Sequence, residues 1–353
     1  MIDFQALNAQ LTPFDEAAAR RAVDKWNAVA KPIASLGKLE DIVVQLAGIS
    51  GSEDVDISKR VVVVMCADNG VVAQGVTQCG SEVTTIIADS VARGRSSVCS
   101  MCRPVHIDTL SVDMGMAKAP SEPGVLDRCI ARGTGDISVG PAMTREQACQ
   151  AIQVGIDLVG DLKAQGYRLI ATGEMGIGNT TTSSAVASVL LGLPVEQVTG
   201  KGAGLSDEGL ERKVSAIKRA IAVNGPDSHD ALDVLAKLGG FDIAGLVGLF
   251  VGGAVHRVPI VIDGFISILA AYVAAQLCPA CAQAMVPSHI STEPATRMLA
   301  ERLGVEPIIH AGMHLGEGTG AVCLVPLLDM ALSLYDGSTF DSSGIDAYEV
   351  DPQ

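Results

Sequence analysis

The chain has 353 residues, of which 48% are hydrophobic, and its mean hydropathy is +0.36. This composition predicts a large buried core, and the formal net charge of −15 argues against nucleic acid as a partner, because phosphate backbones need a basic surface. No apolar run is long enough to span a bilayer, and the first residues have neither the basic nor the apolar part of a secretory signal, so we expect a cytoplasmic protein without membrane contact.

Helical patterns come first along the chain. Apolar residues at helical spacing predict helices over residues 14–30 and 39–49. From residue 61 on, short apolar runs typical of buried strands alternate with helical patterns. The predicted strands cover residues 61–66, 105–112, 168–172, 259–262 and 307–310. The predicted helices cover residues 82–93, 145–165, 182–191, 208–224, 242–257, 269–276, 294–303 and 323–334.

This alternation indicates the fold class. Continuous apolar strands between helices are the signature of a mainly parallel sheet covered on both faces. We therefore predict an α/β fold with a Rossmann-like sheet. The helices at both chain ends are expected to form a small helical domain, residues 1–60 together with 322–353, beside a catalytic domain, residues 61–321. The polar tail after Tyr335 is predicted to be loosely ordered.

Nine cysteines raise the question of metal binding. Two C-x-x-C pairs occur, Cys99 with Cys102 and Cys278 with Cys281, but they lie far apart in the sequence and in apolar, helix-like stretches. In a reducing compartment we expect free, structural thiols. His310 and His314 are spaced like zinc ligands on a helix, but the glutamate of an H-E-x-x-H motif is missing. We predict no metal site.

Ligands of such folds bind beyond the carboxyl ends of the strands. There, residues 173–182 read GEMGIGNTTT, and their glycines, backbone N–H groups and threonine hydroxyls suit a phosphate. An ordinary strand–turn–helix remains the alternative. The segment matches neither the NTPase nor the dinucleotide fingerprint, which disfavours an NTPase and a NAD-dependent dehydrogenase. The Gly-rich turn 200–204, Lys213 and the turn 287–291 are supporting candidates.

A second strand-end segment carries a carboxylate between glycines, Glu317. Its apolar neighbours Leu315 and Ala321 suggest a pocket in which the pKa of this carboxyl rises toward the range that suits a general base. A turn with a solvated acid is the alternative. Glu174 is a second carboxylate with the same placement between a strand and a glycine.

Several segments together carry a resemblance to one family. They are SLGKLE (35–40), CADNGV (66–71), ARGTGDISVGPAM (131–143), GEMGIGNTTT (173–182), GGFDIAGLVG (239–248), IDGFIS (262–267), PSHIS (287–291) and LGEGTGA (315–321). In this order they resemble the nicotinate mononucleotide:5,6-dimethylbenzimidazole phosphoribosyltransferase family, from about residue 31 to 334. The resemblance implies a Rossmann-like sheet, a small helical domain and a dimer.

The resemblance also implies a reaction and its residues. The 5-phosphoribosyl group of nicotinate mononucleotide would pass, with inversion, to an aromatic lower-ligand base for cobamide synthesis. Glu317 would be the general base, with Glu174 as a second catalytic carboxylate. The residues implied to hold the phosphate and ribose are Gly176, Asn179, Thr180, Gly202, Lys213 and Ser291. Because nicotinate leaves as a neutral ring, the reaction needs no metal, and we expect no cofactor.

The acceptor is where the chain departs from the family. Two polar positions that contact the benzimidazole in family members fall on Cys79 and Ile87. With Met175 and Leu315, these residues are predicted to bind the acceptor, which is then either dimethylbenzimidazole or a phenol such as p-cresol. The expected assembly is a homodimer or a heterodimer with a related subunit. A non-catalytic partner subunit of the same family is the alternative function.

Overall fold

The fold is α/β, as predicted. The computed structural model describes residues 2–12 and 14–347. The strands are β1 (Arg60–Ala67), β2 (Asp108–Gly115), β3 (Leu126–Asp127), β4 (Leu169–Met175), β5 (Ile260–Ile262) and β6 (Met285–Pro287). The α-helices are α1 (Phe4–Gln10), α2 (Glu16–Ala28), α3 (Lys38–Ser50), α4 (Glu82–Ala92), α5 (Ser97–Cys102), α6 (Arg145–Ala164), α7 (Asn179–Leu191), α8 (Val195–Val198), α9 (Asp207–Asn224), α10 (Ala231–Leu238), α11 (Phe241–His256), α12 (Phe265–Leu277), α13 (Ala295–Leu303), α14 (Thr319–Tyr335) and α15 (Phe340–Ser343).

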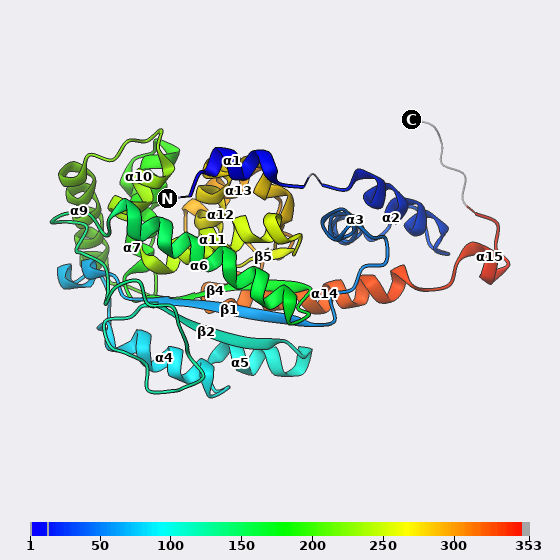
Figure 1. Ribbon diagram of the computed structural model, residues 1–353, viewed down its shortest axis with the longest axis horizontal. Coiled ribbons are helices and arrows are strands. Elements are labelled where there is room, and N and C mark those ends of the chain that lie inside the picture. The colour runs from blue at the N-terminus through cyan, green and yellow to red at the C-terminus, as the bar shows by residue number, and fades with distance from the viewer. Residues whose placement is uncertain (1, 13, 348–353) are drawn as a thin grey trace.

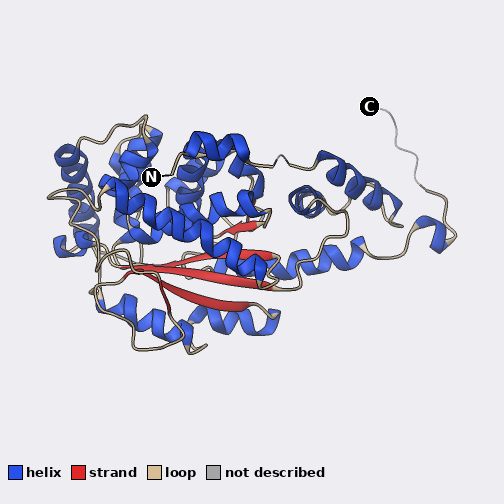
Figure 2. Ribbon diagram, viewed as in Figure 1, coloured by secondary structure: helices blue, strands red, loops and turns tan. Residues whose placement is uncertain are grey.

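The strands of the described residues form one six-stranded sheet in the order β3-β2-β1-β4-β5-β6. Every neighbouring pair is parallel. The sheet lies between helices, with α6, α7, α11 and α12 on one side and α4 and α5 on the other (Figures 1 and 2). All strands therefore end at the same edge, which is where such folds place their ligands.

Strand β1 shows how the sequence specifies both faces. Its alternate residues Val61, Val63 and Met65 belong to the core cluster beneath α6, α11 and α12, whereas Val62 and Val64 belong to the cluster beneath α4, α5 and α14. Every residue of β1 is buried. Because both faces are covered, the strand reads as one continuous apolar run rather than as an alternating pattern.

The helices near the two chain ends pack on each other. Trp26 of α2 and Tyr335 of α14 place their ring centroids 4.8 Å apart, in a small cluster that also holds Val43 and Ala47 of α3. These helices project from one end of the sheet (Figure 1), whereas α1 packs against the 3₁₀ turn Pro279–Ala284 that follows α12. Phe4 and Leu7 of α1 accordingly pack against the large core cluster. The division into residues 1–60 with 322–353 and residues 61–321 stays a prediction.

Most predicted elements coincide with observed ones, and the exceptions are short. The strand predicted over residues 307–310 is wrong: Ile309 makes only an isolated bridge to His289. The last strand of the sheet is instead β6, which was not predicted because its three residues follow a 3₁₀ turn and give no periodic pattern. The strand predicted over residues 105–112 begins later, at Asp108, because His106 adopts a left-handed φ of 53°.

The described part of the tail, residues 336–347, is more ordered than its polarity suggested. Thr339 caps α15 through a capping box with Ser342, and Phe340 is buried. Residues 348–353 of the predicted small domain lie outside the described residues. No described helix is both long and apolar enough to serve as a membrane span.

Candidate active site

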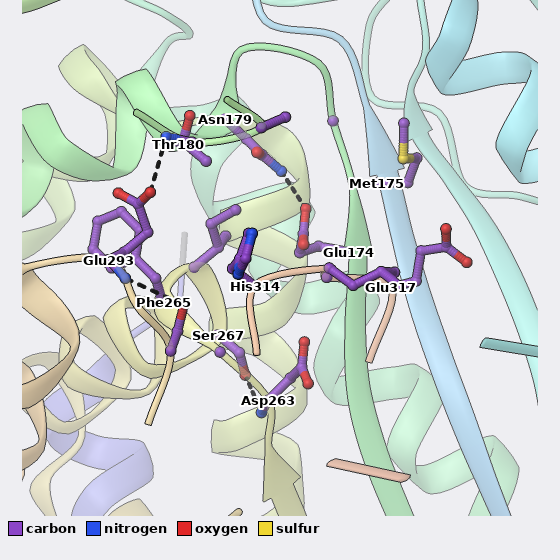
Figure 3. A pocket seen from close by; sticks show the side chains of 18 of the residues that line it. Glu174, Met175, Asn179, Thr180, Asp263, Phe265, Ser267, Glu293, His314 and Glu317 are labelled. Carbon is purple, nitrogen blue, oxygen red and sulfur yellow. Dashed lines mark hydrogen bonds between the residues drawn. The ribbon is translucent and has the colours of Figure 1, made fainter. Parts of the chain in front are cut away.

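A cavity of about 270 Å³ opens beyond the carboxyl ends of β4, β5 and β6 (Figure 3). It brings together most of the residues singled out in the sequence. Its lining residues are Ile87, Glu174, Met175, Gly176, Ile177, Asn179, Thr180, Gly202, Ala203, Asp263, Gly264, Phe265, Ile266, Ser267, His289, Ser291, Glu293, His314, Leu315, Gly316 and Glu317.

Glu317 occupies a strained turn at the entrance to α14. Gly316, Glu317 and Gly318 have φ values of 85°, 59° and 91°, a left-handed run that costs a non-glycine residue about 1–2 kcal/mol. The turn fits because Gly173 of β4 has no side chain: a Cβ there would lie 2.5 Å from the Glu317 carbonyl oxygen. Strained residues of this kind cluster at functional sites, and of the described non-glycine residues with positive φ (Ala34, His106, Arg257 and Glu317) Glu317 is the one that lines the cavity.

The Glu317 carboxylate is nearly enclosed, with 9% of the residue exposed. Its Oε2 accepts a hydrogen bond of 3.1 Å from the backbone N–H of Val98 at the start of α5. Figure 3 shows Glu174 pointing toward Asn179, whereas Glu317 points away from that pair, to the side where Met175 lies. The Val98 N–H bonds to Oε2, so this contact does not engage the other carboxylate oxygen, Oε1.

Asp263 at the end of β5 fixes the other side of this turn, and the sequence patterns did not single it out as a site residue. Its Oδ1 accepts from the backbone N–H groups of Gly320 at 2.8 Å and Ala321 at 3.0 Å, so it caps α14 across the sheet. His289 Nδ1 lies 3.9 Å from the same oxygen. Only the fold brings an aspartate of one strand to a helix that begins more than fifty residues later.

A buried acidic network lies between Glu317 and the start of α7. Asn179 donates through one amide nitrogen to Glu174 Oε2 and, at 3.0 Å, to Asp242 Oδ2. Burial raises the pKa of Glu174 to about 8, partly offset by the Asn179 hydrogen bond and increased by Asp242, Asp263 and Glu317. Burial likewise raises the pKa of Asp242 to about 6. A cation bound beside these carboxyl groups would lower their pKa values and favour the loss of a proton.

Asp242 was not predicted as a site residue. It lies in the first turn of α11, fully buried, and its second oxygen has no hydrogen-bond partner. The available signal was one acid at the start of a long apolar run, FDIAGLVGLF. Gly176 makes the network possible, because a Cβ on this residue would lie 2.3 Å from Asp242 Oδ2.

Three of the residues predicted to hold the phosphate and ribose, Thr180, Gly202 and Lys213, lie together on the side of the cavity away from Glu317, and Lys213 lies behind the lining residues. Lys213 of α9 is fully buried, and its Nζ donates to Thr180 Oγ1 at 2.9 Å and to the Gly200 carbonyl at 3.1 Å. Burial lowers the pKa of this lysine to about 8. Gly202 and Ser291 line the cavity nearby. A buried cation, a hydroxyl and Gly-rich backbone are the groups that bind a phosphate.

The residues predicted to bind the acceptor divide into two groups. Ile87, Met175 and Leu315 are apolar lining residues of the cavity, here called its apolar wall, and Met175 lies on the side toward which Glu317 points (Figure 3). Cys79 is exposed and is not among the lining residues, and its carbonyl accepts from Thr77 Oγ1 at 2.8 Å. The structure therefore brings Ile87, but not Cys79, to this wall. Their roles in acceptor binding stay predictions.

The cysteine and histidine motifs do not contribute to this site as a group. All nine cysteines among the described residues are free thiols. The described part of the chain contains no group of three or more His, Cys, Asp and Glu side chains arranged to hold a metal ion. His314 lines the cavity from a loop rather than a helix, and its Nδ1 lies 3.1 Å from the Gly312 carbonyl oxygen.

Comparisons with known proteins show the family to which the chain belongs. A family model described as phosphoribosyltransferase matches residues 11–345. The nicotinate-nucleotide–dimethylbenzimidazole phosphoribosyltransferase of Acetivibrio thermocellus is 45% identical over 326 residues, which cover 92% of this chain and 93% of the relative. The chain belongs to this family of enzymes.

Further relatives agree. The enzyme of the same name from Ruminiclostridium cellulolyticum is also 45% identical, over 331 residues and 94% of each chain. A solved structure of CobT from Thermus thermophilus superimposes with a TM-score of 0.88 at 35% identity, covering 94% of this chain and 99% of that one. The family predicted from the sequence segments is thus confirmed, and the chain is a phosphoribosyltransferase.

Proposed function

We propose that this chain transfers the 5-phosphoribosyl group of nicotinate mononucleotide to the ring nitrogen of an aromatic base, dimethylbenzimidazole, for cobamide synthesis. One observation carries the proposal: a single cavity has a buried lysine behind its Gly-rich side and a carboxylate beside an apolar wall on its other side. The first group suits a phosphate and the second suits an aromatic acceptor that must lose a proton.

The acidic network between the two sides suits the chemistry of the donor. Nicotinate attached to ribose is a pyridinium cation, and the ribose itself gains positive charge as the bond to nicotinate breaks. Glu174 and Asp242 place negative charge beside this region once they ionise. The electrons of the broken bond return to the nicotinate nitrogen, so the leaving group needs no metal.

The acceptor attacks from the face opposite nicotinate, and the anomeric carbon inverts to the α configuration. A neutral benzimidazole attacks through its unprotonated nitrogen and must then lose the proton of the other nitrogen. Glu317 takes that proton, because it is the carboxylate beside Met175 and the apolar wall. The turn that carries Glu317 can approach Glu174 closely because the neighbouring Gly316 has no side chain: a Cβ there would lie 2.8 Å from Glu174 Oε1.

The purified chain alone tests this function. With nicotinate mononucleotide and dimethylbenzimidazole we expect steady release of nicotinate that depends on the acceptor. A chain that releases no nicotinate by itself, but does so with a related subunit added, would instead be the non-catalytic partner of a heterodimer. The enclosed Glu317 and the buried Lys213 favour the catalytic function, since a retired subunit has no need of either.

Lys213→Ala tests the phosphate side. Losing a charged hydrogen-bond partner of a phosphate costs about 1.5–3 kcal/mol, so the KM for nicotinate mononucleotide should rise at least about ten-fold while the KM for the acceptor changes little. Lys218→Ala on the same helix is the matched control, because Lys218 is exposed and forms a surface ion pair with Glu196. An equal rise in both KM values would place the phosphate elsewhere.

We further propose that the acceptor range extends to phenols such as p-cresol. The wall formed by Ile87, Met175 and Leu315 is apolar, and an unpaired buried polar group costs about 1–3 kcal/mol. A benzimidazole brings two ring nitrogens to this wall, whereas a phenol brings one oxygen, which Glu317 engages. Burying the phenol against this wall therefore costs less free energy than burying the benzimidazole.

Competition between equimolar p-cresol and dimethylbenzimidazole for nicotinate mononucleotide measures this range. We expect both the phenolic and the benzimidazole ribosides among the products, separated by mass. An Ile87→Gln variant, which adds a polar group to the wall, should shift the ratio toward benzimidazole. Exclusive formation of the benzimidazole riboside by the unmodified chain contradicts the extension to phenols.

A further inference from the structure

The phosphate side of the cavity already contains an anion, the chain's own Glu293. Its Oε1 accepts a hydrogen bond of 2.9 Å from the backbone N–H of Gly202, one of the groups that should receive the substrate phosphate. Figure 3 shows the Glu293 carboxylate beside Thr180, whose hydroxyl accepts from Lys213. The sequence patterns did not point to Glu293.

The surrounding backbone is shaped for this carboxylate. A Cβ on Gly200 would lie 2.3 Å from Glu293 Oε2, so only glycine admits the side chain at this depth. The Gly200 carbonyl in turn accepts from Lys213 Nζ at 3.1 Å. The negative charge of Glu293 favours the protonated form of Lys213, against the effect of burial.

The Glu293 carboxylate has only part of its hydrogen bonds satisfied, and this favours its displacement by a ligand. Glu293 Oε2 is buried without any hydrogen-bond partner, and such a group costs free energy as long as it stays there. A phosphate at the same place offers more acceptor oxygens to Gly202, Thr180 and Lys213. Two anions on one backbone N–H group repel each other, so the phosphate and the Glu293 carboxylate cannot share the site.

We propose that Glu293 is a built-in placeholder of the phosphate site, which any phosphate ligand must displace before it binds. This inference rests on the proposed function, because it takes the Lys213 side of the cavity as the phosphate site. Displacement weakens every phosphate ligand by the same factor. A nucleotide with further contacts to the cavity tolerates this loss, whereas free inorganic phosphate is kept from filling the site.

Glu293→Gln tests the placeholder, because glutamine keeps the shape and the acceptor oxygen but loses the charge. Inorganic phosphate binding to the ligand-free chain, measured by calorimetry, should tighten about ten-fold or more, which is the value of a charged over a neutral hydrogen bond. The KM for nicotinate mononucleotide should fall by a similar factor. Glu301→Gln is the matched control, an exposed glutamate of α13 that does not line the cavity.

Two further variants distinguish the outcomes. Glu293→Ala should tighten phosphate binding in the same direction, and thermal unfolding of each variant checks that the chain stays folded. Phosphate binding that is lost in Lys213→Ala but not improved in the Glu293 variants overturns the placeholder alone. A Lys213→Ala variant that binds phosphate as tightly as the unmodified chain overturns both the placeholder and the phosphate site of the proposed function.

Discussion

Glu317→Gln should lower kcat by about 10²–10⁴-fold, the usual contribution of a positioned general base, with little change in the KM for nicotinate mononucleotide. The amide oxygen of glutamine can still accept from the Val98 N–H, so the strained turn and the cavity keep their shape. What the variant loses is the ability to take the acceptor's proton. Steady-state kinetics with both substrates varied measures the two effects separately.

A control variant guards against a general effect of lost charge. Glu211→Gln removes a carboxylate from the exposed face of α9, and its kinetics should match those of the unmodified chain. Turnover by Glu317→Gln within a few-fold of normal would show that the acceptor loses its proton to another group. A higher KM for the nucleotide with normal kcat would place Glu317 on the phosphate side.

Glu174→Gln should lower kcat by about 10²–10³-fold, the usual effect of removing one preorganised group that stabilises transition-state charge. Glutamine keeps the side-chain length and can still accept from Asn179, so binding of the donor should weaken less than turnover. Turnover should suffer more than binding because the ribose gains positive charge, which the Glu174 carboxylate stabilises, only as its bond to nicotinate breaks. A KM effect larger than the kcat effect would make Glu174 a binding residue instead.

The same variant makes a pH prediction whose sign follows from the raised pKa. Burial raises the pKa of Glu174 to about 8, so most of this carboxyl is protonated at pH 7 in the free enzyme. A bound pyridinium cation lowers that pKa, so donor binding at pH 7 should release about one proton. Calorimetry in buffers of different ionisation enthalpy should record a smaller release for Glu174→Gln. Above pH 9 the two proteins should agree, because Glu174 is then already ionised.

The order of elements and the strand-end segments were predictable because they are local. Continuous apolar runs such as β1 and glycine–carboxylate turns such as the one around Glu317 are written in consecutive residues. The turn that holds Glu317 needs glycines on both sides, and these are visible in the sequence. The turn fits into the fold, however, only because Gly173 of β4, far away in the sequence, has no side chain.

What escaped the sequence patterns is the set of contacts between distant segments. Asp242 and Glu174 share Asn179, and Asp263 caps a helix that begins 56 residues later, at Thr319. Glu293 meets Gly202 from 91 residues away. Asp242, Asp263 and Glu293 look ordinary among their own neighbours in the sequence. Cys79 is exposed and is not among the residues that line the cavity, and its role in binding the acceptor stays a prediction.

The most direct test of the proposed transfer is the structure of its product. The purified chain should convert nicotinate mononucleotide and dimethylbenzimidazole to one nicotinate and one riboside phosphate, in equal amounts. Nuclear magnetic resonance of the riboside should show the ring nitrogen bonded to the anomeric carbon in the α configuration. A β-linked riboside, or free ribose 5-phosphate formed in place of any riboside, would contradict the account of an inverting transfer to an acceptor deprotonated by Glu317.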